Sequence, residues 1–373
     1  MVEDLKKFEH LLQFKEENKA ITVAVGMSGG VDSSTVGYLL KKQGYNVIGI
    51  TMKHWSGMDE YATDSNSKSC CSLDDIHDAR RVCDDLEIPH YVINLTEPFK
   101  NIVVDYFIDE YAKGRTPNPC MVCNRYIKLG KLMEAALKLG ADYVATGHYA
   151  RIKNGLLSTG DDPRKDQVYF LMKKEYVKYL MFPIGELEKP QVRELAKALG
   201  VRVHAKRESQ EICFVEDGKY KEFLDTMTNG KISKAGNIIL ENGTIVGKHE
   251  GITSYTIGQR KGLGVSYHEP LYVLKIDSEK NEVIVGSDDK LFRNSVTGSD
   301  INLFTVDSIN DLDGLQCFAK ARSRDRLHKG YVKVLNNKEI EFISEDMFRA
   351  VTPGQGLVLY TEDGVVIASS FIK

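Results

Sequence analysis

The chain has 373 residues, of which 42% are hydrophobic and 28% charged, which is typical of a folded protein and excludes a mostly disordered chain. A typical domain of about 150 residues predicts two to three domains for this length. The formal net charge of −3 excludes a bulk polycation, so nucleic-acid binding would need a local basic patch.

The chain shows no targeting or membrane signal that we can identify. No apolar run is long enough to cross a membrane, and the first residues are too polar for a secretion signal and too acidic for a transit peptide. We therefore expect a cytoplasmic protein with no membrane partner. Seven cysteines in such a chain favour reactive or metal-binding thiols over a disulfide framework.

The first half of the chain alternates predicted strands with predicted helices. The expected strands are 21–27, 46–52, 90–95 and 141–146. A long helix is expected over 97–112. Three more helices are expected from apolar residues at helical spacing. The first stripe is Val36, Leu39 and Leu40, the second is Ile76, Ala79, Cys83 and Leu86, and the third is Leu129, Leu132, Met133, Ala136 and Leu139. This alternation predicts an α/β fold with a doubly wound parallel sheet. Ligands of such folds bind beyond the carboxyl ends of the strands, so segments 26–34, 51–55 and 147–149 are expected to converge.

The sequence pattern changes after about residue 215, and residues 230–373 are expected to be mainly β, in two small units with a boundary near 285. Asn242–Gly243 lies between two strand-like runs and is a strong signal for a two-residue hairpin. Asn336–Asn337 and Asp363–Gly364 occupy similar positions and predict two further turns.

The glycine-rich segment 26–34, which reads GMSGGVDSS, connects the first expected strand to the first expected helix. Glycines let backbone amides approach an anion, and a helix N-terminus attracts negative charge. The chain has no G-x-x-x-x-G-K-[ST] motif, so this is not a Walker loop, and a tight turn without a ligand is the alternative. SGGVDS resembles the pyrophosphate loop of the ATP pyrophosphatase (PP-loop) superfamily. That resemblance implies an adenine nucleotide alpha hydrolase-like domain that binds ATP, with Asp32 helping to hold Mg²⁺ and pyrophosphate.

Two cysteine-containing segments narrow the choice within that superfamily. Residues 114–124 contain Cys120 and Cys123 behind two prolines, and residues 209–215 contain Cys213. Cys123 precedes a predicted helix, whose dipole favours a thiolate. With further ordered matches in 70–82, 146–150, 165–171, 256–264 and 351–355, the chain resembles the tRNA-specific 2-thiouridylase (MnmA-type) family almost end to end.

This resemblance implies ATP-dependent 2-thiolation of the wobble uridine of tRNA, in which the C2 oxygen is adenylated, sulfur is transferred, and AMP and pyrophosphate are released. The implied ATP site consists of Gly26, Met27, Ser28, Gly29, Gly30, Val31, Asp32, Ser33, Met52 and Gly147. Cys213 would carry a persulfide, and Cys123 would release its sulfur through a transient disulfide with Cys213. The implied tRNA contacts are Asn118, Pro119, Cys120, His148, Lys165, Asp166, Gln167, Arg322, Ser323 and Gln355.

The family's organisation implies a catalytic PP-loop domain over 1–215, a central tRNA-contacting domain over 216–285 and a C-terminal β-barrel over 286–373. The implied sulfur donor is a cysteine desulfurase or a sulfur-carrier protein. Two other functions stay open, namely an amide-forming ATP pyrophosphatase of the argininosuccinate or GMP synthetase type, which needs no cysteine, and a non-catalytic tRNA-binding module.

Cys120 departs from the pattern of the family, because many members have Asp there as the proposed acid/base. Cys120, Cys123 and Cys213 form a three-thiol set of the kind that holds an iron–sulfur cluster with one iron left open for hydrosulfide. Such a cluster and a persulfide route are both consistent with the residues. A closed zinc site has no evident fourth ligand, and a thioredoxin-like pair has no other support.

A further basic signal comes from Lys320, Arg322, Arg324, Arg326 and His328, which alternate along a strand-like run. A period of two predicts one cationic face for RNA phosphates, with an ordinary solvated face as the alternative. The family usually has an aromatic residue where Ser323 stands. Segment 259–261 is a second candidate RNA contact, and 54–55 is a candidate adenine contact. We expect Cys83 and Cys317 in the core and Cys70 and Cys71 in a loop.

Overall fold

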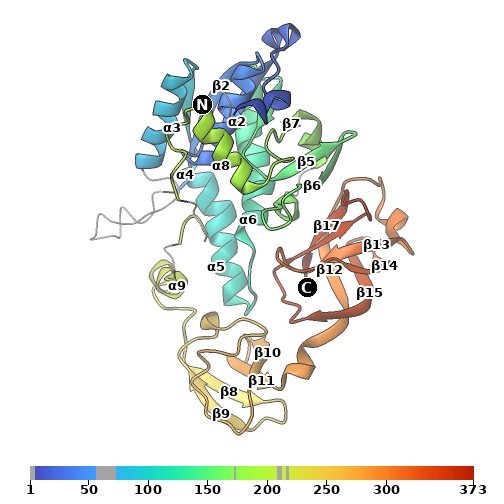
Figure 1. The fold of residues 1–373 in the computed structure, drawn as a ribbon. Coiled ribbons are helices and arrows are strands. Elements are labelled where there is room, and N and C mark those ends of the chain that lie inside the picture. The colour runs from blue at the N-terminus through green and yellow to red at the C-terminus, as the bar shows by residue number, and fades with distance from the viewer. Residues whose placement is uncertain (1–4, 56–72, 172–173, 208–211, 216–217) are drawn as a thin grey trace. The chain divides into compact units, whose positions relative to one another are not determined.

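The computed structural model describes residues 5–55, 73–171, 174–207, 212–215 and 218–373 (Figure 1). Cys70 and Cys71 lie outside these residues. Contacts divide the chain into two compact units, a first unit of Met1–Val103 with Cys120–Glu216 and a second unit of Val104–Pro119 with Asp217–Lys373. Within the described ranges, no helix has the length and apolar character needed to span a membrane.

The first unit contains a five-stranded parallel sheet in the order β3-β2-β1-β4-β7. Its strands are β1 (Thr22–Gly26), β2 (Asn46–Lys53), β3 (His90–Asn94), β4 (Tyr143–Ala145) and β7 (Leu180–Met181). The first four match the expected strands, which confirms the predicted α/β fold class. Strand β1 is buried along its centre because helices cover both faces of such a sheet, which is why its sequence is a continuous apolar run.

Helices follow the strands in the expected places. Those of eight or more residues are α2 (Val31–Lys42), α3 (Leu73–Asp85), α5 (Asp105–Ala112), η4 (Cys123–Leu132), α8 (Lys189–Ala198) and α9 (Tyr220–Thr228). The shorter ones include α4 (Thr96–Phe99), η3 (Lys100–Val104), α6 (Pro119–Val122) and α7 (Met133–Lys138). The helix expected over 97–112 is present as α4, η3 and α5, with η3 in the wider π form.

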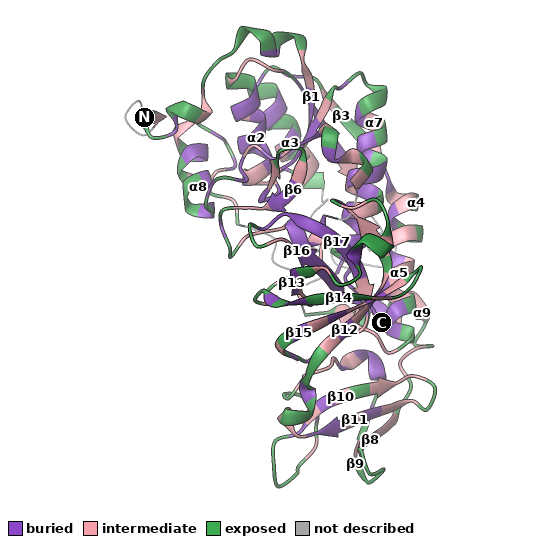
Figure 2. Ribbon diagram, turned by 90° about the vertical axis from the view of Figure 1, so that its right-hand side faces the viewer, coloured by how far each residue is buried: buried purple, intermediate pink, exposed green. Residues whose placement is uncertain are grey.

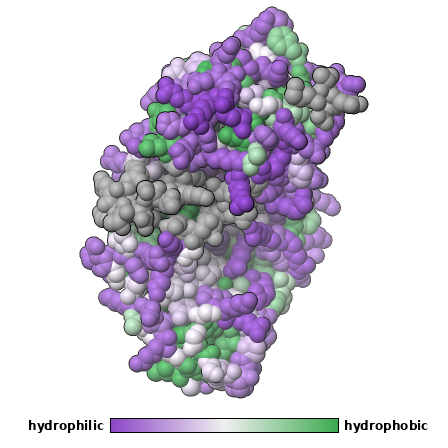
Figure 3. All heavy atoms as spheres, turned by 60° about the vertical axis from the view of Figure 1, so that its left-hand side comes forward, coloured by the Kyte–Doolittle hydropathy of each residue, from purple (hydrophilic) through white to green (hydrophobic). Residues whose placement is uncertain are grey.

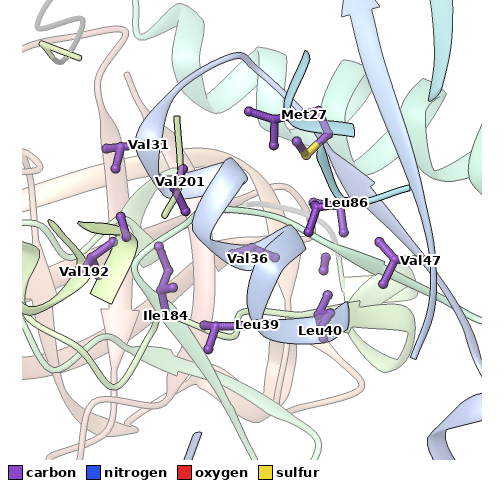
Figure 4. Close-up of a cluster of buried hydrophobic side chains, with 14 of the residues drawn as sticks. Met27, Val31, Val36, Leu39, Leu40, Val47, Leu86, Ile184, Val192 and Val201 are labelled. Atoms are coloured by element: carbon purple, nitrogen blue, oxygen red, sulfur yellow. The ribbon is translucent and has the colours of Figure 1, made fainter. Parts of the chain in front are cut away.

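The core of the first unit is built around α2. Val36, Leu39 and Leu40 are fully buried, as the helical stripe predicts. Figure 4 shows these side chains beside Ile184 and Val192, which come from the segment before α8 and from α8 itself. This packing fixes the N-terminus of α2, and with it the glycine segment that begins the helix.

The first unit also contains a hairpin that the sequence reasoning missed, formed by β5 (Ala150–Lys153) and β6 (Leu156–Thr159). Its turn is Asn154–Gly155, with φ of 52° and 77°. Asn-Gly is the same hairpin signal that was recognised at 242–243.

The second unit contains a four-stranded sheet and a closed six-stranded barrel. The sheet, in the order β10-β11-β8-β9, consists of β8 (Gly236–Leu240), β9 (Ile245–His249), β10 (Tyr272–Asp277) and β11 (Glu282–Gly286). The barrel, in the order β12-β15-β14-β13-β16-β17, consists of β12 (Phe292–Leu303), β13 (Gln316–Lys320), β14 (His328–Asn336), β15 (Glu339–Arg349), β16 (Gly356–Tyr360) and β17 (Val366–Ile372). All three expected turns connect antiparallel strand pairs, which confirms those hairpins.

The barrel closes around an apolar interior. Strand β16 is buried along its whole length, and Figure 2 shows β16 and β17 mainly in the colour of buried residues. Hydrophobic residues also reach the surface of the second unit. In Figure 3 they gather at the lower end of the view, where Figure 1 places β8 and β9, and Ile245 in β9 is 59% exposed.

The expectation of one cationic strand over 320–328 is wrong. Strand β13 ends at Lys320 and β14 begins at His328, and the residues between them form bends and turns. A local hydrogen bond from the Asp325 amide to the Arg322 carbonyl, 3.1 Å long, closes one of these turns. The five residues therefore do not share a strand face, and His328 is buried between Asp325 and Asp346.

Candidate active site

The glycine segment forms a tight loop between β1 and α2. Gly29 has a φ of 70°, and a Cβ placed there would lie 2.3 Å from the Asp75 carbonyl oxygen, so only glycine fits. The Ser33 hydroxyl accepts a hydrogen bond from the Ser28 amide over 3.2 Å. Gly147, which follows β4, approaches the same loop so closely that a Cβ would lie 2.8 Å from the Ser33 nitrogen. The structure thus brings Gly147 against the first turn of α2.

Asp32, in that first turn, is held by two side chains from distant parts of the chain. The Lys189 ammonium donates to both carboxylate oxygens over 2.7 Å, and the Tyr149 hydroxyl donates to one of them over 3.0 Å. The Lys189 side chain is 9% exposed and the Asp32 side chain 27%. Tyr149 belongs to segment 147–149, which the sequence predicted to converge on this loop, whereas the sequence reasoning did not single out Lys189. The only local feature of Lys189 is its place as the first residue of helix α8, which does not indicate a contact with Asp32.

Lys206 ties the loop to helix α3. Its ammonium donates to the Gly29 carbonyl over 3.1 Å, to Asp75 over 2.7 Å and to Asp78 over 2.6 Å. Burial alone would lower the pKa of Lys206, but the hydrogen bonds to the two carboxylates outweigh it and raise the pKa. The loop is therefore clamped on one side by Lys206 and on the other by Gly147.

This arrangement fits the phosphates of a nucleotide. Helix α2 presents the amides of its first turn, Ser28 and Ser33 add hydroxyls, and Lys189 supplies a buried positive charge. Asp32 supplies a carboxylate of the kind that Mg²⁺ prefers. Met52 lies half-buried at the end of β2, which pairs with β1 immediately before the loop.

The cysteines differ in their surroundings. Cys120 in α6 is exposed, Cys123 at the start of η4 is buried, and Cys213 is half-buried. The sulfur of Cys213 lies 3.7 Å from Nε2 of His54, a contact that the sequence did not predict. Among the described residues, which include these three cysteines, no three His, Cys, Asp or Glu side chains converge on a point where a metal could sit. The donor set for an iron–sulfur cluster is thus not assembled in this part of the chain.

Two cysteines lie in the core, as expected. Cys83 packs in the core of the first unit and Cys317 inside the barrel. Burial raises the pKa of each thiol to about 12. Neither sulfur therefore ionises at neutral pH.

The candidate tRNA residues of the first unit make hydrogen bonds within the protein. His148 is 8% exposed, and its Nδ1 lies 2.7 Å from the Thr146 hydroxyl. Burial, with a smaller effect from the Lys128 charge, lowers the pKa of His148 to about 3, so the ring is neutral. The Gln167 side chain accepts from the Tyr149 amide over 3.0 Å. Asp166 accepts from the Gly160 amide over 3.0 Å, and Lys165 beside it is half-buried.

In the second unit, the Asn118–Pro119 segment packs on the loop that contains Gln355. The Gln355 amide donates to the Thr116 carbonyl over 2.9 Å, and the Asn118 amide lies 3.5 Å from the Gln355 side-chain oxygen. Gly354 has a φ of 91°, and a Cβ there would lie 2.9 Å from the Thr116 oxygen. Gln355 thus fixes the backbone of the segment that contains Asn118.

Arg322 connects the segment before β10 with the segment that follows β15 in the second unit. Its guanidinium donates to the Ile257 carbonyl over 3.3 Å, to the Ala350 carbonyl over 2.8 Å and to the Thr352 hydroxyl. Ser323 beside it is half-buried. The contacts of Arg322 indicate a structural role in this conformation.

Comparison with known proteins places the whole arrangement in a family. Family models described as tRNA methyl transferase HUP domain, tRNA methyl transferase PRC-barrel domain and aminomethyltransferase beta-barrel domain match residues 21–217, 221–287 and 295–372. The tRNA-specific 2-thiouridylase MnmA 1 of Fusobacterium nucleatum is 53% identical over 98% of this chain and 97% of its own length. Those of Caldanaerobacter subterraneus and Clostridium perfringens are 46% and 44% identical, each over 92% of this chain and 96% of theirs. The chain therefore belongs to the tRNA-specific 2-thiouridylase (MnmA) family.

Proposed function

We propose that this protein uses ATP to replace the C2 oxygen of a tRNA wobble uridine with sulfur. The observation that carries the proposal is the match to 2-thiouridylases over nearly the whole chain, at up to 53% identity. The clamped glycine loop supports it, and so do Cys123 and Cys213, because an amide-forming ATP pyrophosphatase has no need of these cysteines.

The first step is adenylation of the uracil. The C2 oxygen is a poor leaving group, whereas AMP is a good one, so adenylation makes displacement by sulfur feasible. The amides at the start of α2 and the Lys189 ammonium would hold the phosphates, and Asp32 would hold Mg²⁺. Mg²⁺, when bound, neutralises phosphate charge as pyrophosphate leaves.

The second step transfers sulfur from a persulfide on Cys213. Its terminal sulfur attacks C2 of the uracil, and AMP leaves with the C2 oxygen. The Cys123 thiolate then attacks the Cys213 sulfur and breaks the S–S bond, so that the transferred sulfur stays on the base. The resulting Cys123–Cys213 disulfide is reduced by an external thiol, and a cysteine desulfurase or sulfur carrier reloads Cys213.

The third part of the proposal concerns the tRNA. The wobble uridine must leave the anticodon stack, which costs roughly a few kcal/mol. We assign Asn118, Pro119 and Cys120 to the target base, and the residues from 216 onward to the remaining tRNA contacts. The hydrogen bonds from Gln355 to the segment before Pro119 support this assignment, since they fix the backbone that would meet the base.

The proposal is tested with purified protein, unmodified tRNA transcript, Mg²⁺–ATP and a persulfide donor. We expect 2-thiouridine by mass spectrometry together with pyrophosphate release, and no thiolation by Cys213→Ala or Cys123→Ala. Full ATP-dependent turnover by Cys213→Ala would favour the amide-forming alternative. Salt-sensitive tRNA binding without pyrophosphate release would favour a binding module.

A second measurement separates the two sulfur routes. Protein purified without air is assayed for iron and acid-labile sulfide beside Cys120→Ala. Because the three cysteines do not converge with other ligands in the described residues, we expect no stoichiometric iron. Iron and sulfide that are lost in Cys120→Ala would replace the persulfide step with iron-bound hydrosulfide.

A further inference from the structure

His54 and Cys213 are 159 residues apart in the sequence, yet Nε2 of His54 lies 3.7 Å from the Cys213 sulfur. His54 follows β2 in the first unit and is 7% exposed. The half-buried Cys213 sulfur therefore contacts the His54 imidazole, to which the proposed reaction steps assign no role.

The second ring nitrogen of His54 fixes the direction of this contact. Nδ1 lies 3.3 Å from the Met52 carbonyl oxygen, which can only accept a hydrogen bond. In the neutral ring Nδ1 therefore carries the hydrogen, and Nε2 is left as an acceptor. The Cys213 thiol is then the donor, with its proton directed at Nε2.

Aromatic side chains hold the imidazole in this orientation. The His54 ring packs against Phe99 at a centroid distance of 4.7 Å, and Phe99 contacts Phe214 edge-on at 5.6 Å. Trp55 contacts Phe99 and Phe214 at 6.3 and 6.2 Å. Since Trp55 and Phe214 directly follow His54 and Cys213 in the sequence, this cluster fixes both partners of the pair.

We propose that His54 is a catalytic residue that positions the Cys213 sulfur and accepts its proton when the persulfide is loaded. This inference rests on the proposed function. In the loading step, the Cys213 thiolate attacks the terminal sulfur of a donor persulfide, so one S–S bond forms and the donor S–S bond breaks. The donor thiolate leaves with the bonding electrons and receives the proton held on Nε2, which balances the exchange without an oxidant or a reductant.

The test isolates loading from the later steps by leaving out ATP and tRNA. Protein is mixed with cysteine persulfide, and the peptide that contains Cys213 is quantified by mass spectrometry over time. A thiol with a pKa of about 8.5 is only about 3% thiolate at pH 7, so we expect loading in His54→Ala to be roughly ten- to thirtyfold slower. Added imidazole should restore part of the rate in His54→Ala, which a purely structural defect would not allow.

Two further variants keep the test decisive. His54→Gln retains a side-chain oxygen that can accept a hydrogen bond but not the proton, so it should fold and still load slowly. His90→Ala is the matched control, because His90 lies on the neighbouring strand β3 and bonds Thr51 over 2.8 Å. Its loading rate should match that of the unaltered protein.

The outcomes separate this inference from the proposed function. Loading of unaltered protein together with equally fast loading of His54→Ala and His54→Gln would overturn the role of His54 alone. Failure of unaltered protein to form a Cys213 persulfide from any donor would overturn the persulfide route itself, and the role of His54 with it.

Discussion

The Lys189 ammonium contacts both carboxylate oxygens of Asp32 at 2.7 Å, although 157 residues separate the two. Lys189 begins helix α8, where Glu188 and Gln191 form a capping box and the Lys189 amide donates to Asp162 over 3.1 Å. The helix start is thus fixed independently of Asp32. As a result, the carboxylate in the glycine loop is oriented before any nucleotide arrives.

Replacing Lys189 with Met should slow pyrophosphate release by at least about tenfold, because a charge-assisted contact to the loop is lost and Asp32 keeps only the hydrogen bond from Tyr149. Affinity for tRNA should not change. The measurement is tRNA-dependent pyrophosphate release at saturating ATP. Lys197→Met, at an exposed position of the same helix, is the control. Equal rates for the two variants would remove Lys189 from the phosphate site.

Gly29→Ala should abolish ATP binding. The added Cβ would meet the Asp75 carbonyl at 2.3 Å, and the φ of 70° is itself unfavourable for alanine. Gly155→Ala has the same unfavourable backbone conformation, with a φ of 77°, but no steric clash, since its Cβ would enter open space. Isothermal titration with ATP should show binding for Gly155→Ala, which loses only about 1 kcal/mol of stability. Binding by Gly29→Ala would contradict the close approach of the loop to α3.

The buried neutral His148 predicts a stability that falls in acid. Its pKa is about 3 in the folded protein, below the ordinary 6.5, so between these values the unfolded chain binds a proton that the folded chain does not. The contribution of His148 is complete above about pH 6.5 and is lost on acidification, at up to about 1.4 kcal/mol per pH unit. His148→Gln should remove this slope. Urea unfolding midpoints at about pH 7 and about pH 5 measure it in both proteins. Equal slopes would mean that His148 is protonated in the folded state.

Sequence patterns were sufficient where structure depends on neighbours in the chain. Strands β1 to β4 and the turn at Asn242–Gly243 follow from apolar runs and turn residues, which act over a few positions. The prediction of one cationic strand over 320–328 was wrong because turn-forming residues such as Asp325 bend the backbone locally. The charges do alternate with a period of two, but that pattern cannot reveal such a bend.

The site was less predictable because it depends on which elements pack together. The glycine loop and the three candidate cysteines were found from local motifs and from the resemblance to a family. Lys189 was not singled out, and His54 was noted only as a candidate adenine contact, since their partners Asp32 and Cys213 lie 157 and 159 residues away. Only the packing of α8 against α2, and of Phe214 against Trp55 and Phe99, brings these pairs together.

The reactivity of the thiols should follow their burial. Cys120 is exposed, whereas burial raises the pKa of Cys83 and Cys317 to about 12. Because the thiolate is the reactive form, iodoacetamide should label Cys120 in the native protein and spare the two core cysteines until it unfolds. Peptide mass spectrometry after a short exposure measures this. Early labelling of Cys317 would show that the barrel opens readily.

Comparing Arg322→Ala with Arg324→Ala should distinguish an arginine with a structural role from one that binds RNA. Arg322 donates to carbonyls from two parts of the second unit, so Arg322→Ala removes these hydrogen bonds and should cost about 1–3 kcal/mol of stability. Arg324 is exposed in the turn after β13, and Arg324→Ala should leave the melting temperature unchanged. If its charge meets an RNA phosphate, the slope of log Kd against log salt should fall by about one in Arg324→Ala and stay constant in Arg322→Ala. Thermal melting and tRNA binding at several salt concentrations test both. A flatter slope with unchanged melting in Arg322→Ala would mean that Arg322 leaves its carbonyl partners to contact the tRNA.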